Sequence, residues 1–189
     1  MKILAIDIGA GTQDVLLYDD RKKSLENCFK MVLPSPCQVF AKKIRKITEL
    51  GMDLVIKGDT IGGGPLSYAL KQHIKAGFKI FMTESAAYTL RNNLMQVKEI
   101  GIKLVSEANV GKIEGHSIFF QEINIDKFYG FLKEYEETFF DIDYVAIAVQ
   151  DHGVFPPRMS NREFRLNKLK ELLLKNPKPE VFAFKENQI

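Results

Sequence analysis

Short apolar runs alternate with turn residues in the first part of the chain, which is the pattern of strands joined by tight turns. One run leads from Ile3 to Asp7, and a second leads from Val15 to Asp19, with a glycine-rich turn between them. A further apolar segment, 28–33, adds a strand. The pattern therefore predicts three successive strands, of which the first two form a hairpin.

The next segment alternates between helix and strand patterns. Ser35, Pro36 and Gln38 are typical of an N-cap, a first helical position and a capping box, and Gly51 is a typical helix stop. The elements predicted after this helix are strand 53–57, helix 65–77, strand 79–82 and helix 84–92. The resulting order, β-β-β-α-β-α-β-α, is that of the ribonuclease H-like fold, and such alternation also favours a mainly parallel α/β sheet. We therefore expect an α/β domain in which helices flank one mixed central sheet.

The second half of the chain is less regular. It is predicted to hold strands at 103–105 and 117–123, a helix at 125–139, a strand at 144–149 and a helix from Ser160 to near Pro177. The strand at 144–149 is apolar on both faces, as an interior parallel strand would be. We expect one domain over residues 1–175. Residues 176–189 would form a tail, or a linker to a missing second half.

The turn between the first two strands has the composition of a phosphate-binding loop. Glycines at 9 and 11 let backbone N–H groups approach an oxyanion, because no Cβ stands in the way. Thr12 adds a hydroxyl donor, and Asp7 at the strand end could hold a hydrated Mg²⁺ ion against the same phosphate. The alternative is a plain hairpin in which the glycines only form the turn.

This hairpin resembles the phosphate-binding loops of the superfamily that contains actin, the Hsp70 chaperones and the sugar kinases. The resemblance implies one half of such an ATPase, built on the ribonuclease H-like fold. It also implies that ATP or ADP phosphates are held at Gly9, Ala10, Gly11, Thr12 and Gln13, with Mg²⁺ at Asp7. The residue order is that of the superfamily's second phosphate loop, whereas the N-terminal position is that of the first.

Two further segments carry residues suited to chemistry. The segment 58–65 joins a strand to a helix through Asp59 and three glycines, which makes it an anion site by geometry or a flexible connection. Asp151 and His152 follow the apolar strand at 144–149, as a chemical site or as turn and capping residues. If these strands run parallel in one sheet, Asp7, Asp59 and Asp151 gather at one edge. Converging carboxylates there would suit Mg²⁺ binding or a general base.

These segments together resemble a second family, a group of uncharacterised microbial proteins named for similarity to pyruvate formate-lyase activating enzymes. The resemblance covers about residues 2–166 and includes the segments 6–14, 58–65, 148–153 and 160–165. It supplies no known activity. A radical-generating activase needs three clustered cysteines for its iron–sulfur cluster. This chain has Cys28 and Cys37, nine residues apart, so we expect free thiols and no such cluster.

Members of that family look longer and carry a second glycine-rich loop. An actin-type site closes on ATP between two halves, each of which provides one loop. We therefore expect this chain to be a fragment, a half that forms a homodimer, or a subunit that needs a second lobe or partner.

Composition and charge indicate which classes of partner and which cellular location to expect for this protein. The 189 residues fit one domain, and 27 basic against 24 acidic side chains leave a net charge of +3. That charge is too small to indicate a nucleic-acid or membrane surface. The basic cluster at 42–46 fits the polar face of an amphipathic helix. The sequence shows neither a signal peptide nor an apolar stretch of about 20 residues, so we expect a cytoplasmic protein.

The leading functional hypothesis is a nucleotide-binding half with ATPase or phosphotransferase activity. In it, Asp59 and Asp151 would orient water or an acceptor as catalytic groups. The chain alone is expected to be incomplete. Two other classes remain open: a Mg²⁺-dependent ribonuclease H-like nuclease, and an interaction domain that keeps the fold without binding a ligand.

Overall fold

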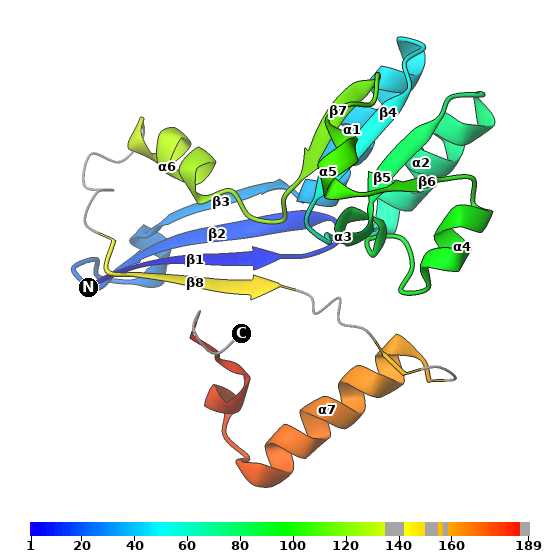
Figure 1. Ribbon diagram of the computed structural model, residues 1–189. Helices are drawn as coiled ribbons and strands as arrows, with labels where there is room; N and C mark the ends of the chain where they lie inside the picture. The colour runs from blue at the N-terminus through cyan, green and yellow to red at the C-terminus, as the bar shows by residue number, and fades with distance from the viewer. Residues whose placement is uncertain (135–141, 150–154, 157–158, 186–189) are drawn as a thin grey trace. The chain divides into compact units, whose positions relative to one another are not determined.

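The computed structural model describes residues 1–134, 142–149, 155–156 and 159–185 (Figure 1). The chain divides into two compact units, Met1–His152 and Gly153–Ile189. The first unit contains two four-stranded sheets, and the second contains a long helix.

The first sheet is mixed and has the strand order β3-β2-β1-β8. Its strands are β1 (Lys2–Ile8), β2 (Thr12–Asp19), β3 (Phe29–Pro34) and β8 (Tyr144–Val149), and a short 3₁₀ turn, η1 (Leu25–Asn27), precedes β3. The first three strands pair antiparallel, whereas β8 runs parallel to β1. One face of the sheet buries Leu4, Ile6 and Ile8 against Phe128 of helix α6 (Ile125–Lys133). Burial therefore alternates along β1, because successive side chains point to opposite faces of the sheet.

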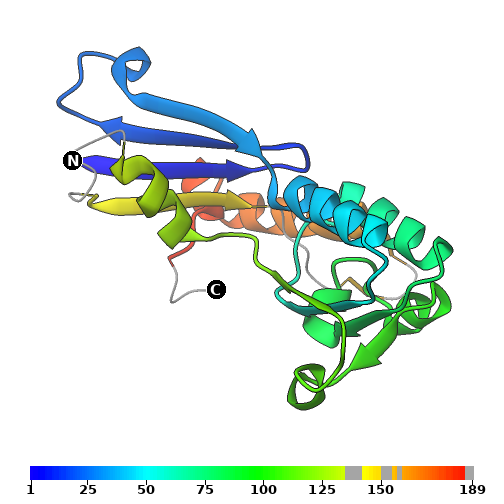
Figure 2. The same ribbon diagram turned by 90° about the horizontal axis from the view of Figure 1, so that it is seen from above.

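The second sheet is entirely parallel and has the strand order β6-β5-β4-β7. Its strands are β4 (Leu54–Gly58), β5 (Ile80–Thr83), β6 (Lys103–Val105) and β7 (His116–Phe120). Helices α1 (Pro36–Glu49) and α2 (Gly64–Lys75) lie side by side and share a core with this sheet (Figure 2). Short helices α3 (Glu84–Ala87), α4 (Leu94–Glu99) and α5 (Glu107–Val110) lie in its other connections.

Helix α1 begins and ends as its sequence predicts. The Ser35 hydroxyl accepts a hydrogen bond from the Gln38 N–H at 3.4 Å, and Pro36 occupies the first helical position. Gly51 follows the helix with φ of 71°, a conformation that costs glycine little. The predicted boundaries of this helix are therefore confirmed.

The mixed α/β class is confirmed, but the prediction of a single central sheet is wrong. The second edge of β1 pairs with β8, where Ile3 lies opposite Tyr144, 141 positions farther along the chain. Strand β4 is therefore not a neighbour of β1. Instead β4 pairs with β5 on one side and β7 on the other, and it becomes the centre of a separate sheet. Both arrangements satisfy the same apolar runs, because hydrophobic patterning does not select the partner strand.

Two further predictions need correction. Strand β8 is parallel as expected, but it lies at the edge of its sheet and all six residues are exposed. An apolar run with no alternation does not distinguish an edge strand from an interior one. The helix predicted at 84–92 ends at Ala87, because tight turns at Thr89 and Leu90 follow it. The helix predicted at 125–139 is described only to Lys133, and residues 135–141 lie outside the described residues.

The second unit is built on α7 (Asn161–Lys175), followed by a short 3₁₀ turn, η2 (Pro179–Phe182). The Ser160 hydroxyl accepts from the Glu163 N–H at 3.1 Å, so the N-cap predicted there is confirmed. In the parts of the chain that the structure describes, no helix has the length and apolarity needed to cross a membrane. The predicted division at residue 175 stays a prediction.

Candidate functional site

The glycine-rich turn between β1 and β2 is held in place by the start of α1. Within the turn, the Gly9 N–H donates to the Thr12 carbonyl at 2.9 Å. The Ser35 hydroxyl and the Cys37 thiol both donate to the Ala10 carbonyl, at 3.0 and 3.1 Å. Because Ser35 is fully buried and Cys37 nearly so, these contacts fix the turn against a packed part of the molecule.

The second glycine-rich segment, which joins β4 to α2, is fixed just as closely. Gly58 has φ of 107°, and a Cβ there would overlap the Phe120 carbonyl of β7. Farther along, the Ile61 N–H donates to the Thr89 hydroxyl at 3.0 Å. A Cβ on Gly63 would lie 2.6 Å from the Thr89 carbonyl oxygen. The glycines are therefore needed here for close packing of backbone against backbone.

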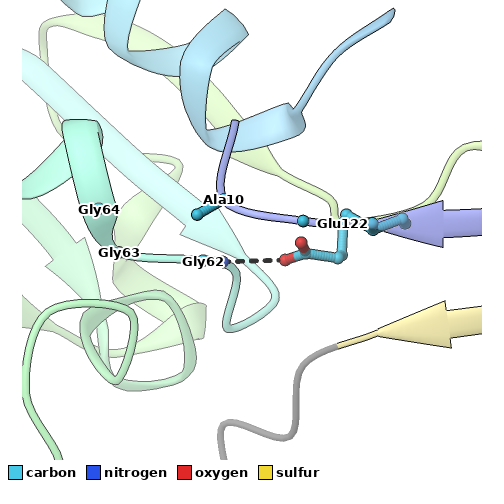
Figure 3. A pocket seen from close by; sticks show the side chains of 7 residues that line it. Ala10, Gly62, Gly63, Gly64 and Glu122 are labelled. Atoms are coloured by element: carbon cyan, nitrogen blue, oxygen red, sulfur yellow. Dashed lines mark hydrogen bonds between the residues drawn. The ribbon is translucent and has the colours of Figure 1, made fainter. Parts of the chain in front are cut away.

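The two glycine-rich segments meet at one hollow. It is lined by Ile8, Gly9 and Ala10 from the first turn, by Gly62, Gly63 and Gly64 from the second, and by Glu122 (Figure 3). The Gly62 N–H donates to Oε2 of Glu122 at 3.0 Å. A backbone donor of the second segment is thus already bound to a carboxylate oxygen.

The position of the hollow follows from the topology of the second sheet. After β4 the chain moves through α2 to β5, whereas β7 returns to the opposite side of β4. The strand order therefore reverses between β4 and β7. In open parallel sheets, ligands bind outside the carboxyl ends of the strands at such a reversal. The segment after β4 and Glu122 after β7 occupy this place.

The start of α2 adds an electrostatic contribution. Gly63 is its N-cap and Gly64 its first residue, and the helix runs for 12 residues. The first N–H groups of a helix lack partners within the helix, and its N-terminus carries a partial positive charge. Pro65 has no N–H group, so the glycines before it supply the nearest backbone donors. Such an arrangement favours an oxyanion.

Gly11, Thr12 and Gln13 of the first turn, which are also predicted to bind phosphate, do not line the hollow. Gln13 donates through Nε2 to the Pro34 carbonyl at 2.9 Å, which ties β2 to β3. Thr12 donates through its hydroxyl to the Asp14 carboxylate at 3.1 Å. Gly11 accepts from the Ser35 N–H through its carbonyl at 3.1 Å. Of the five residues predicted to bind phosphate, Gly9 and Ala10 are therefore the two that line the hollow.

The predicted acidic residues are placed differently from one another. Asp7 is exposed and lies directly opposite Asp14 in the β1–β2 pair. Asp59 follows β4, is exposed, and donates its N–H to the Phe120 carbonyl at 2.9 Å. Neither Asp7 nor Asp59 lines the hollow. Asp151 lies outside the described residues, as does His152.

Glu122 is the site residue that the sequence prediction missed. It lies just after β7, within the segment 117–123 that was predicted to be a strand. An acid at the carboxyl end of a predicted strand was the signal used for Asp7 and Asp59. Applied to the end of β7, the same signal would have found Glu122.

The described residues would supply few ligands to a metal ion. Among them, no group of three or more histidine, cysteine, aspartate or glutamate side chains comes together. Cys28 and Cys37 are free and buried, as predicted for thiols without a disulfide.

The comparison with protein families gives a match over most of the chain. The family described as "Putative pyruvate format-lyase activating enzyme (DUF1786)" matches residues 61–189, more than half of the chain. Gly62–Gly64 and Glu122 lie inside the matched region, whereas the β1–β2 turn lies outside it. No curated protein and no solved structure matches the chain.

Proposed function

The chain belongs to the family described as putative pyruvate format-lyase activating enzyme (DUF1786), and we propose that it binds the phosphates of MgATP or MgADP. It would act as one half of a protein of the actin, Hsp70 and sugar kinase type. The observation that carries the proposal is the meeting of the two glycine-rich segments at one hollow, where the Gly62 N–H already binds a carboxylate oxygen. Backbone donors that hold a carboxylate have the polarity that a phosphate requires.

The order of elements in the first sheet supports the ribonuclease H-like part of the proposal. Along the chain, β1, β2, β3, α6 and β8 follow the order β-β-β-α-β. They form one mixed sheet whose apolar face is covered by α6. In this interpretation, α1 and the second sheet are an insertion between the third strand and the helix that follows.

Each residue class has a role in the proposed site. Ala10 and Gly62–Gly64 would hold phosphate oxygens through backbone N–H groups. Gly9 would line the site without donating, because its N–H is bonded to the Thr12 carbonyl, and Gly11, Thr12 and Gln13 would shape the turn. Asp7 would hold Mg²⁺ through its water shell, and the ion would neutralise phosphate charge. Asp59 and Asp151 stay in the proposal as groups that orient water or an acceptor.

The proposal extends to a partner. In the superfamily that the hairpin resembles, the nucleotide lies between two halves, and each half contributes a loop. We propose that a second lobe, a partner subunit or a second copy supplies the other half. Binding to this chain alone should then be in the millimolar rather than the micromolar range.

Isothermal titration with MgATP and MgADP tests the proposal. The informative variant is Gly62→Ala, because its Cβ would make ordinary contacts with Cys37, 3.8 Å away, while adding bulk at the hollow. Gly111→Ala is the control, since its Cβ would enter open space outside the hollow. We expect weaker binding in Gly62→Ala and unchanged binding in Gly111→Ala. The absence of heat from the unmodified protein at high millimolar nucleotide would refute the proposal.

A further inference from the structure

We propose that Glu122 makes the hollow select phosphates that carry a divalent cation over phosphates that do not. This inference rests on the proposed function and names a specificity residue for the same site. Glu122 would compete with a bare anion for the Gly62 N–H. It would become a ligand, direct or through water, when a cation accompanies the phosphate.

The first step is the contact itself. Glu122 is half-buried, and its Oε2 atom lies 3.0 Å from the Gly62 nitrogen, which is a good charge-assisted hydrogen bond. Residues 62 and 122 are 60 positions apart, and the bond joins the segment after β4 to the segment after β7. Figure 3 shows the carboxylate directed toward Gly62, between the two glycine-rich segments. A phosphate oxygen bound at the Gly62 N–H would therefore have to displace Glu122.

The second step is the charge of the lining. Among the described residues that line the hollow, Glu122 is the one ionisable side chain, and none is lysine or arginine. Backbone N–H groups and the start of α2 contribute partial positive charge at the hollow. A bare phosphate would bring further negative charge to within a few ångströms of a carboxylate. Two like charges about 4 Å apart disfavour binding by a factor of about five even at the dielectric constant of bulk water, and by more near a protein surface.

The third step is the effect of a divalent cation, which replaces the repulsion between Glu122 and the phosphate by a shared attraction to the ion. Carboxylate and phosphate oxygens are the ligands that Mg²⁺ prefers, and protein sites for Mg²⁺ commonly join one or two carboxylates to substrate phosphates. With Mg²⁺ present, Glu122 and the phosphate attract the same ion instead of repelling each other. The carboxylate thus penalises the free anion and favours its metal complex.

The test compares ATP and pyrophosphate in Mg²⁺ with the same ligands in EDTA, by isothermal titration on the full chain. The variant is Glu122→Gln, which removes the charge and keeps a side-chain oxygen to accept from the Gly62 N–H. Glu114→Gln is the matched control: Glu114 is exposed, does not line the hollow, and precedes β7 where Glu122 follows it. Melting temperatures of all three proteins establish that they are equally folded.

We expect the unmodified protein and Glu114→Gln to bind the Mg²⁺ complexes at least about tenfold more tightly than the free anions. In Glu122→Gln, that ratio should fall about fivefold or more, through tighter binding of the free anion and weaker binding of the complex. An unchanged ratio in Glu122→Gln, with binding of the complexes intact, would overturn this inference and leave the proposed function standing. If neither ligand binds to any of the three proteins, both fail together.

Discussion

The hydroxyl of Thr48 lies 2.7 Å from Nδ1 of His73, and this contact joins α1 to α2 inside the core. The same hydroxyl donates its single proton to the Ile44 carbonyl at 2.9 Å. It must therefore accept from His73, which assigns the ring proton to Nδ1. The ring is fully buried, and Nε2 has no hydrogen-bond partner in the described part of the chain.

The burial of the His73 ring predicts that the folded state loses stability in acid. Burial lowers the pKa of His73 from its usual value of 6.5, while the Lys79 backbone and the Asp53 charge oppose the shift. Below pH 6.5 the unfolded chain takes up a proton that the folded chain resists. The stabilisation is therefore complete above pH 6.5 and is lost as the pH falls, by up to about 1.4 kcal/mol per pH unit for one proton. Urea unfolding between pH 7.5 and 5 measures the slope.

The control for this prediction is a second histidine. His116→Gln removes a half-buried ring at the start of β7 and should keep the acid sensitivity of the unmodified protein. His73→Gln should lose part of that sensitivity. Equal pH slopes in all three proteins would contradict the assignment.

A second prediction concerns Gly58. Substitution by alanine should lower the free energy of unfolding by about 2–4 kcal/mol, because φ is 107° and the new Cβ would overlap the backbone of Phe120. The added atom would strain the pairing of β4 with β7 and displace the segment that carries Gly62. Denaturant unfolding measures the loss. Gly111→Ala, where the Cβ meets open space, should stay within about 0.5 kcal/mol.

A third prediction separates binding from stability at Asp7. Asp7 and Asp14 face each other across β1 and β2, so two like charges are held close together. Asp7→Asn should leave stability unchanged or raise it by about 0.2–1 kcal/mol. It should weaken binding of MgADP, because Asp7 is the proposed holder of the ion. Asp14→Asn is the comparison, since it relieves the same repulsion. Equal affinities for MgADP in the two variants would remove the proposed role of Asp7.

A fourth prediction uses two serine N-caps. Ser35→Ala removes both the cap of α1 and the hydrogen bond to the Ala10 carbonyl. It should cost about 2 kcal/mol of stability and loosen the β1–β2 turn. Ser160→Ala removes the cap of α7, so its cost should be about 1 kcal/mol. Thermal unfolding gives both values. Phosphate affinity should fall in Ser35→Ala and stay unchanged in Ser160→Ala. An equal fall in phosphate affinity in the two variants would show that the turn is not held by Ser35.

The elements with local causes could be predicted from the amino-acid residues alone. Ser35 and Pro36 started α1, and Ser160 started α7, because a cap needs nothing beyond its own first turn. The glycine-rich turn after Asp7 also formed where the two apolar runs predicted it. Each of these features depends on residues within a few positions of one another.

Contacts between distant segments could not be predicted in this way, because they depend on how the whole chain packs. The apolar pattern of a strand does not specify its partner strand. Strand β1 could therefore have paired with the segment 54–58, but it pairs with β8. The consequence was two sheets instead of one. The hollow depends on the same long-range choices, because Glu122 reaches Gly62 only when β7 returns to the side of β4 away from β5. Strand pairing of this range is set by the packing of the whole core, which local sequence patterns do not encode.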